Sequence, residues 1–175
     1  MFADLEAQYD AADASALAGE IADRSRRELA LVTVTDRLRA CVGPVTLGLP
    51  GHAPVTGTVA AIGADWVLIA EGTVEVLVIS AAVIWVRGLP FQAEPERSAL
   101  AARLDLGYVL RGVARDRAGV WLLLNDGSAV AGTIDRVGRD FVDVAEHARG
   151  EPRRADSVHS ARAVPFGALV AVRGI

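Results

Sequence analysis

The chain has 175 residues, of which 52% are apolar and 23% are charged, so it can build a packed core and is not an intrinsically disordered protein. The formal net charge of −4 argues against a protein that coats duplex DNA without sequence preference. No apolar run is long enough to span a membrane, and the lone cysteine, Cys41, excludes a disulfide framework within one chain. We therefore expect a soluble, cytoplasmic protein.

Residues 1–35 predict an N-terminal helical segment. Apolar side chains recur at helical spacing in its first part, at Phe2, Leu5, Tyr9 and Ala12. A second helical stretch begins near Ser15, a plausible N-cap, and a helix restarted at Thr35 would cover residues 36–41. The segment carries seven acidic residues and three arginines, so we expect it to dock on the rest of the chain or on a partner rather than on nucleic acid.

Residues 36–91 predict five short strands separated by turn residues. The strands are expected at residues 44–49, 55–61, 66–70, 74–79 and 83–86. Pro50 and Gly51 form the turn between the first two strands, and Gly57 predicts a bend or bulge in the second. Five strands in so short a segment are typical of a small curled sheet or barrel.

Residues 92–106 predict a linker that leads into a helix, and residues 107–175 predict a second set of strands. The helical pattern includes Leu104, Leu110 and Val113 and ends before Gly119. The further strands are expected at residues 120–124, 130–136, 141–145, about 162–164 and 169–172. A loop of about residues 147–159 is inserted into this set.

The second set of strands repeats the first. Residues 130–146 align with residues 55–71 without gaps, and eight of the 17 positions are identical. The match resumes where Val86-Arg87-Gly88 meets Val172-Arg173-Gly174, after 11 extra residues in the second copy. Two copies are too few for a solenoid, so each copy should fold by itself. The expected fold class is α+β, mainly β, with two tandem five-stranded small barrels, each preceded by a helix.

The second copy resembles the Sm/LSm (Hfq-like) family of small SH3-like barrels. Residues 123–134 carry an apolar strand, an Asp126-Gly127 turn and a glycine five residues later, Gly132, as in the first Sm motif. A short helix followed by five bent strands is also the layout of that family. The resemblance covers both copies, and it implies a non-enzymatic, oligomeric regulatory protein that binds RNA.

The nucleotide-binding residues of the family have candidate equivalents in the second copy alone. An Asp and then an Asn follow the second strand in the family, and Asp140 and Asp143 are the candidates here, whereas the first copy has Asp65 and Leu68. Nearby arginines could contact RNA phosphates. The candidate nucleic-acid-binding residues are Arg136, Arg139, Asp140, Asp143, Arg153 and Arg154. The lost pair in the first copy and the net acidity favour an alternative, a protein–protein assembly or scaffold module.

Comparison of the two copies also assigns strand faces, because side chains alternate along a strand. Val67 and Ile69 match Val142 and Val144 and should face a core, and Ile84 should face it as well. The candidate interface residues, which lie on the opposite face, are Trp66, Leu68, Val83 and Trp85. They would be covered by other parts of the chain or by pairing of strand edges, which Sm proteins use to build rings.

No arrangement of residues predicts catalysis, a metal or another cofactor. The three histidines, His52, His147 and His159, are scattered without ligand spacing, and no catalytic triad or phosphate-binding loop is present. The expected partners are RNA, a second copy or another protein, with no membrane. Arg87-Gly88 and Arg173-Gly174 are interpreted as strand exits.

Overall fold

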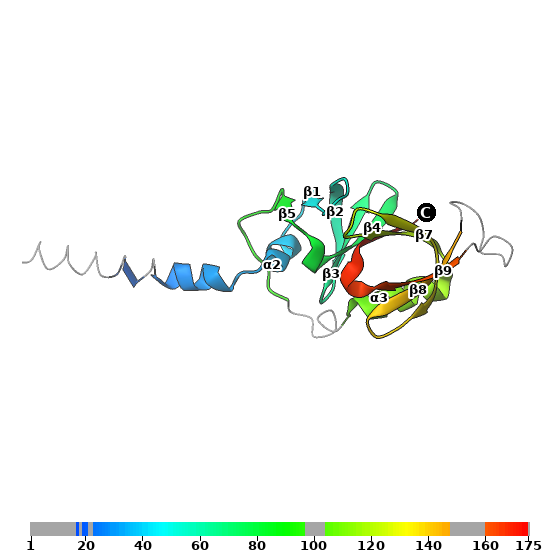
Figure 1. Ribbon diagram of the computed structural model, residues 1–175. Helices are drawn as coiled ribbons and strands as arrows, with labels where there is room; N and C mark the ends of the chain where they lie inside the picture. Colours follow the sequence, from blue (N-terminus) through cyan, green and yellow to red (C-terminus); the bar gives the residue numbers. More distant parts are fainter. Residues whose placement is uncertain (1–16, 18, 21–22, 97–103, 148–159, 175) are drawn as a thin grey trace, which may run out of the picture. The chain divides into compact units, whose positions relative to one another are not determined.

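The computed structural model describes residues 17, 19–20, 23–96, 104–147 and 160–174 (Figure 1). The chain divides into two units, residues 1–34 and residues 35–175. In the first unit, residues 23–31 are helical, and the side chains of Leu17, Leu29 and Leu31 are exposed. The helical pattern expected at residues 2–12 and the N-cap expected at Ser15 lie outside the described residues.

In the second unit, the described residues form two α-helices and ten strands. Helix α2 (Val34–Arg39) overlaps the helix predicted at residues 36–41 but begins before Thr35, the predicted cap. It precedes β1 (Val45–Gly48), β2 (Val55–Ile62), β3 (Trp66–Glu71), β4 (Val74–Ile79), the 3₁₀ turn η1 (Ser80–Ala82) and β5 (Trp85–Arg87). Helix α3 (Leu106–Asp116) precedes β6 (Gly119–Leu124), β7 (Ala129–Val137), β8 (Phe141–Glu146), β9 (Ser160–Pro165), the 3₁₀ turn η4 (Phe166–Ala168) and β10 (Leu169–Gly174). All ten predicted strands are confirmed, with ends that differ by up to a few residues.

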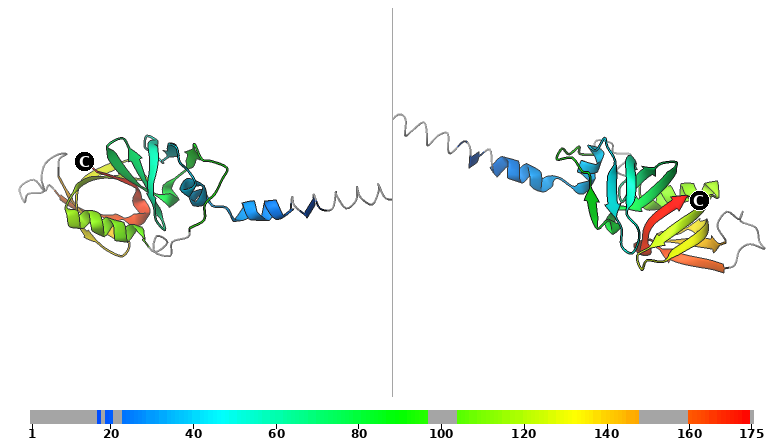
Figure 2. Two further views of the ribbon diagram at one scale, coloured as in Figure 1. Left: turned by 180° about the vertical axis from the view of Figure 1, so that it is seen from behind. Right: turned by 90° about the horizontal axis from the view of Figure 1, so that it is seen from above.

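The prediction of two tandem five-stranded Sm-like barrels is wrong. The strands form one ten-stranded antiparallel sheet in the order β5-β1-β2-β3-β4-β10-β6-β7-β8-β9, and this sheet curls without closing (Figures 1 and 2). The physical reason is that β4 pairs with β10, placing Val78 opposite Ala171 and Leu77 opposite Val172. Backbone groups at the edge of each strand set therefore pair with the other set, so the two sets become one sheet.

The repeat nevertheless persists within the single sheet. The first half of the sheet (β1–β5) and the second half (β6–β10) have the same internal strand order. Their registers also agree, because Val67 lies opposite Val78 in the first half and Val142 lies opposite Val164 in the second. Each strand of one half therefore has a counterpart in the other, and β4 corresponds to β9 as β5 corresponds to β10.

Glycine allows a close strand approach at the same place in both halves. A Cβ on Gly57 would lie 2.1 Å from the carbonyl oxygen of Ala70, and a Cβ on Gly132 would lie 2.2 Å from that of Ala145. The strand register shifts shortly afterwards, between Val59 and Ala61 in the first half and at the matching place in the second. The bend predicted from the glycines is thus a β-bulge.

Two hydrophobic cores lie on opposite faces of β3 and β4. Alternate side chains of these strands join one core with Leu38 of α2 and Leu47 of β1; they are Val67, Ile69, Val76 and Val78. The intervening side chains Trp66, Leu77 and Ile79 join the other core, together with Leu106 and Leu110 of α3. The apolar residues on both faces of β3 and β4 are therefore covered within the chain.

Candidate interaction edges of the sheet

Four of the six candidate nucleic-acid-binding residues lie together on the β7–β8 hairpin. Arg136 lies opposite Asp143 in the strand register, while Arg139 and Asp140 lie in the exposed turn between the strands. Phe141, which follows this turn, is 36% exposed. The other two candidates, Arg153 and Arg154, lie outside the described residues.

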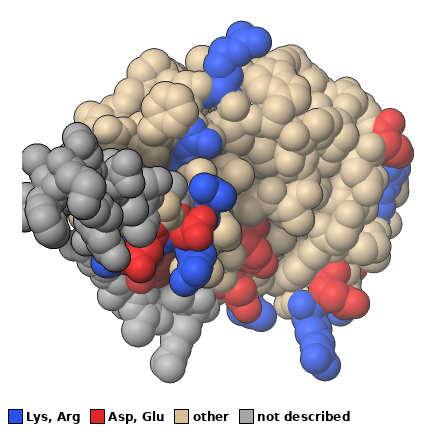
Figure 3. Space-filling view, turned by 90° about the vertical axis from the view of Figure 1, so that its left-hand side faces the viewer, with Lys and Arg blue, Asp and Glu red and all other residues tan. Residues whose placement is uncertain are grey.

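Acidic residues accompany these arginines, so the hairpin is not a basic patch. Three carboxylates, those of Asp135, Asp140 and Asp143, lie within the same short segment as Arg136 and Arg139. On the side of the molecule in Figure 3, basic and acidic side chains are likewise interspersed among uncharged residues. A nucleic-acid phosphate backbone is attracted by a surface on which positive charge is concentrated, and neither the hairpin nor this side of the molecule is such a surface.

Trp66 and Leu68, two of the four candidate interface residues, are covered by the chain itself. Trp66 is 6% exposed, and its indole Nε1–H donates to the Leu104 carbonyl oxygen at 2.8 Å. The neighbouring Asp65 carboxylate accepts from the Leu106 N–H at 2.8 Å. Leu68 is half-buried against the same core. This end of β3 therefore holds the start of α3, and it is not available to another chain.

The other two candidates, Val83 and Trp85, differ from each other. Val83 is half-buried against the core that contains Leu38, so the prediction that it faces away from the core is wrong. Ile84, predicted to face the core, is instead 63% exposed. The cause is η1, which separates β4 from β5 and breaks the alternation of side chains on which the prediction rests. Trp85 is 42% exposed on β5, as an interface residue should be.

The junction between β4 and β10 is a strand-edge contact with buried side chains. Five residues at its centre are buried, namely Val76, Leu77, Val78, Ala171 and Val172. Arg173 of β10 forms an ion pair with Glu71, which ends β3. The two halves are therefore joined by backbone pairing, apolar packing and one charge pair.

The two equivalent hairpin turns also meet beside this junction. A Cβ on Gly51 would lie 2.7 Å from the Cα of Gly127, and both glycines have positive φ angles. His52 Nε2 lies 2.7 Å from the Leu124 carbonyl oxygen. In the second turn the pKa of Asp126 is lowered, chiefly because its carboxylate accepts from the Ser128 hydroxyl and N–H, with the nearby His52 as a smaller cause.

Within the described residues, the sheet ends at β5 and β9, which lie at opposite ends of the second unit (Figure 1). The Ile84 N–H, just before β5, donates to the Gly48 carbonyl on β1, and Trp85 of β5 lies opposite Gly48 in the strand register. Arg87 also lies over the Trp85 ring, 5.6 Å from its centroid. Each edge strand thus presents backbone groups that can pair with another strand.

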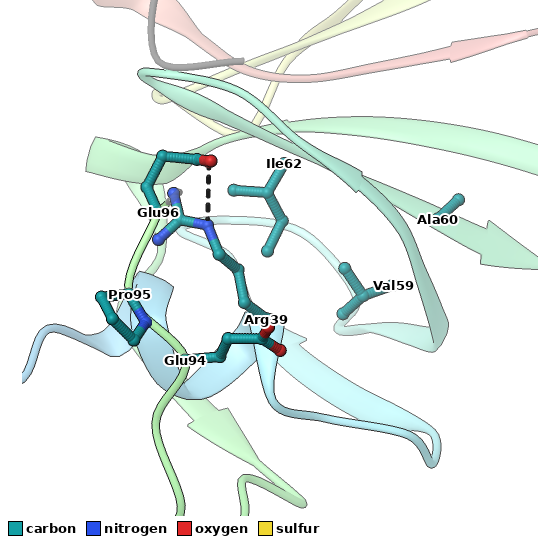
Figure 4. Close-up of a pocket in the computed structure, with 7 residues that line it drawn as sticks. All are labelled: Arg39, Val59, Ala60, Ile62, Glu94, Pro95 and Glu96. Carbon is teal, nitrogen blue, oxygen red and sulfur yellow. Dashed lines mark ion pairs between the residues drawn. The ribbon is translucent and has the colours of Figure 1, made fainter. Parts of the chain in front are cut away.

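A pocket of about 430 Å³ lies between α2, β2 and the segment after β5 (Figure 4). The Arg39 guanidinium at its wall pairs with Asp36 at 2.9 Å and with Glu96 at 3.2 Å. Glu94 also lines it, so the acidic groups outnumber the basic one. Arg39 is committed to joining α2 to the segment after β5, and the pocket has no free cation for an anionic ligand among its described residues.

The described residues form no group of three or more metal-ligating side chains. The buried His147 and Thr133 side chains hydrogen-bond to each other at 2.8 Å, which gives this histidine a structural partner. No helix in the described part of the chain is long and apolar enough to cross a membrane. No protein-family model matches the chain, and no curated protein matches it.

Proposed function

We propose that this protein is an assembly module that binds protein partners by adding β-strands to the edges of its sheet. The observation that carries the proposal is the β4–β10 junction, in which two strand edges already join through three register pairs and a charge pair. Main-chain hydrogen bonds supply affinity in this mode of recognition, and side chains on alternate positions supply specificity. We infer that the protein acts in the cytoplasm, where Cys41 would stay reduced.

Exposed apolar side chains at one edge support this function. Ile84 and Trp85 lie at β5, and an aromatic side chain with an apolar neighbour is a common anchor in protein–protein interfaces. The second edge strand, β9, exposes its first four residues, Ser160 to Ala163. Both edges are therefore accessible in the described part of the molecule.

RNA binding at the β7–β8 hairpin is the second candidate function. Its support is the exposed Phe141 on the same hairpin as Arg136 and Arg139, since an aromatic ring can stack on a base and an arginine can contact a phosphate. The acidic residues on the same hairpin weaken this candidate, so we place it second.

Site-specific photo-crosslinking in cells tests the assembly function. A photo-reactive amino acid is placed at Ile84 just before β5, at Ala161 on β9, or at the control position Arg136 on β7. We expect protein crosslinks from both edge positions and far fewer from the control.

A titration of the protein with labelled oligo-U and oligo-A at low and physiological salt tests the RNA-binding candidate. Binding that weakens steeply with salt, and further in the Arg136→Ala/Arg139→Ala variant, together with no protein crosslinks at either edge, would replace the assembly function with RNA binding.

A further inference from the structure

We propose that the helix of the first unit pairs antiparallel with the same helix of a second copy, which gives a two-fold dimer. The helical residues of this unit that the structure describes are 17, 19–20 and 23–31, and the unit is separate from the one that holds the sheet. The proposed contact therefore uses neither sheet edge, and the inference goes beyond the proposed function.

The leucines of this helix are exposed. Leu17 and Leu31 are 59% and 80% exposed, and neither belongs to the two hydrophobic cores formed by the described residues. A helix of this length is marginal in water by itself, because helical stability in proteins comes mainly from packing of an apolar face. A partner that covers these leucines would therefore stabilise the helix.

Four residues of the helix share one face through heptad spacing, and we call this face the seam. Leu17, Arg24 and Leu31 are seven residues apart, and Glu28 follows four residues after Arg24, so all four lie on the same side of the helix. Leu29 is also exposed, but it lies about 100° around the helix from Glu28. The seam thus has a leucine at each end and a pair of opposite charges between them.

The charges of the seam indicate what the partner is. The Arg24 guanidinium pairs with the Glu28 carboxylate at 2.9 Å, and both side chains are exposed, so each can reach a further group. In an antiparallel pair with its two-fold axis midway between these two residues, Arg24 of each copy lies opposite Glu28 of the other. The seam is therefore complementary in charge to itself, as a two-fold contact requires.

Charge disfavours a parallel pair of the same helices. Parallel pairing would place Arg24 opposite Arg24 and Glu28 opposite Glu28, and like charges at a helix seam repel. Residues 1–20 contain five acidic residues and no arginine, and a parallel pair would also set the two copies of this stretch side by side. Antiparallel pairing places the two acidic stretches at opposite ends, so it avoids both repulsions.

The dimer would join two sheets into one particle. In an antiparallel pair the C-terminal ends of the helices, from which each chain continues to its sheet, lie at opposite ends of the pair. Two linked binding modules raise the effective concentration of the second binding event. The helix would therefore make a protein that binds through its sheet bivalent.

Light scattering of the purified full chain over a concentration series tests the dimer. We expect a discrete dimer that dissociates on dilution. Leu31→Ser should raise the dimer Kd about tenfold or more, because it removes an apolar contact of the seam. Leu29→Ser, which changes an exposed leucine of the same helix outside the seam, is the matched control and should leave the Kd unchanged.

Charge reversal tests the pairing of Arg24 with Glu28 of the second copy. Arg24→Glu and Glu28→Arg should each weaken the dimer, whereas Arg27→Glu, the same change beside the seam, should weaken it less. Mixing Arg24→Glu with Glu28→Arg should restore the dimer, because both contacts of the mixed pair then join opposite charges. An ion pair that acts within one helix alone is not restored by mixing. Far-ultraviolet circular dichroism checks the helix content of each variant.

Disulfide formation in a Cys41→Ser background tests the orientation. A mixture of Arg24→Cys and Glu28→Cys should form a mixed disulfide, because these positions face each other. Leu17→Cys should not crosslink to itself, since the two copies of this residue would lie about 27 Å apart along the helix axis.

The outcomes separate this inference from the proposed function. A chain that stays monomeric at all concentrations overturns the dimer and leaves the sheet-edge function, which the photo-crosslinks test, standing. A dimer that Leu29→Ser weakens as much as Leu31→Ser does, or that the mixed charge variants do not restore, also overturns the inference, because the contact then lies elsewhere. A disulfide formed by Leu17→Cys with itself overturns the antiparallel arrangement.

Discussion

The β4–β10 junction and the outer edges β5 and β9 occupy equivalent places in the repeat, but their side chains differ. Val76 and Leu77 are buried in the junction, whereas their counterparts on β9, Arg162 and Ala163, are exposed. Charged residues on an edge strand are a usual protection against uncontrolled sheet pairing. The comparison shows that the same strand position can be buried in the core in one half and can form an exposed, charged sheet edge in the other.

The largest expected effect comes from breaking the internal junction. Leu77→Ala removes a buried side chain shared with the core beneath α3, and it should lower the free energy of unfolding by about 2–5 kcal/mol. The matched change at the outer edge, Ala163→Leu, adds an exposed side chain and should change it by about 0.5 kcal/mol or less. Urea denaturation measures the free energy of unfolding of both variants, and equal losses of stability would contradict this prediction.

Substitution of the bulge glycines should have the next largest effect on stability, and this effect should be equal in both halves. Gly57→Ala and Gly132→Ala each force a Cβ against a carbonyl oxygen, which should lower the free energy of unfolding by about 1–3 kcal/mol. Gly112, whose added Cβ would meet nothing within 4 Å, is the control, and Gly112→Ala in α3 should stabilise slightly. Thermal unfolding compares the three, and a tolerated Gly57→Ala would show that the halves bend differently.

The charge pair of the junction should contribute little to folding. Glu71→Gln removes the partner of Arg173, but both side chains are partly exposed, so the free energy of unfolding should fall by about 0.2–1 kcal/mol. Glu146→Gln, the matched change at the outer edge, removes the partner of Arg162 and should likewise lower the free energy of unfolding by about 0.2–1 kcal/mol. Chemical denaturation measures both variants, and a loss well above about 1 kcal/mol in either would contradict this prediction.

The smallest expected effect is a pH dependence confined to one of the two equivalent turns. The pKa of Asp126 is lowered from its ordinary value of 3.8 by hydrogen bonds from Ser128. Its ionised form therefore stabilises the folded state above that value, and this contribution is lost as pH falls through the folded-state pKa. Asp126→Asn should slightly flatten the loss of stability below pH 4, as followed by denaturation at several pH values. The Pro50-Gly51-His52 turn carries no carboxylate, and His52 is only a minor cause of the lowered Asp126 pKa, so His52→Gln should change the loss of stability in acid less than Asp126→Asn does.

The strands were predictable because their signals are local. Turn residues such as Pro50-Gly51 and Asn125-Asp126-Gly127 mark the ends of the apolar runs, and the internal repeat predicts each strand a second time from the other copy. The bends at Gly57 and Gly132 were predictable for the same reason. The error at Val83 and Ile84 shows the limit, because a three-residue 3₁₀ turn shifts the alternation and leaves no clear signal in the sequence.

The candidate site was only partly predictable. Trp85 was identified because an apolar face without a partner is visible from side-chain alternation. The ion pair of Arg173 with Glu71 was missed, because Arg173 was interpreted only as part of a strand exit. The two residues belong to different halves of the sheet, and only the β4–β10 pairing brings them together.

The sequence by itself determined ten strands, a duplicated order and the apolar faces of β3, because each depends on residues close together in the chain. Only the tertiary structure decided that the two halves share one sheet and that Trp66 lies beneath the start of α3. Backbone groups at a strand edge are alike in every residue, so a sequence does not reveal which edges will pair. That choice depends on packing between residues far apart in the chain, such as Leu77 with Val172.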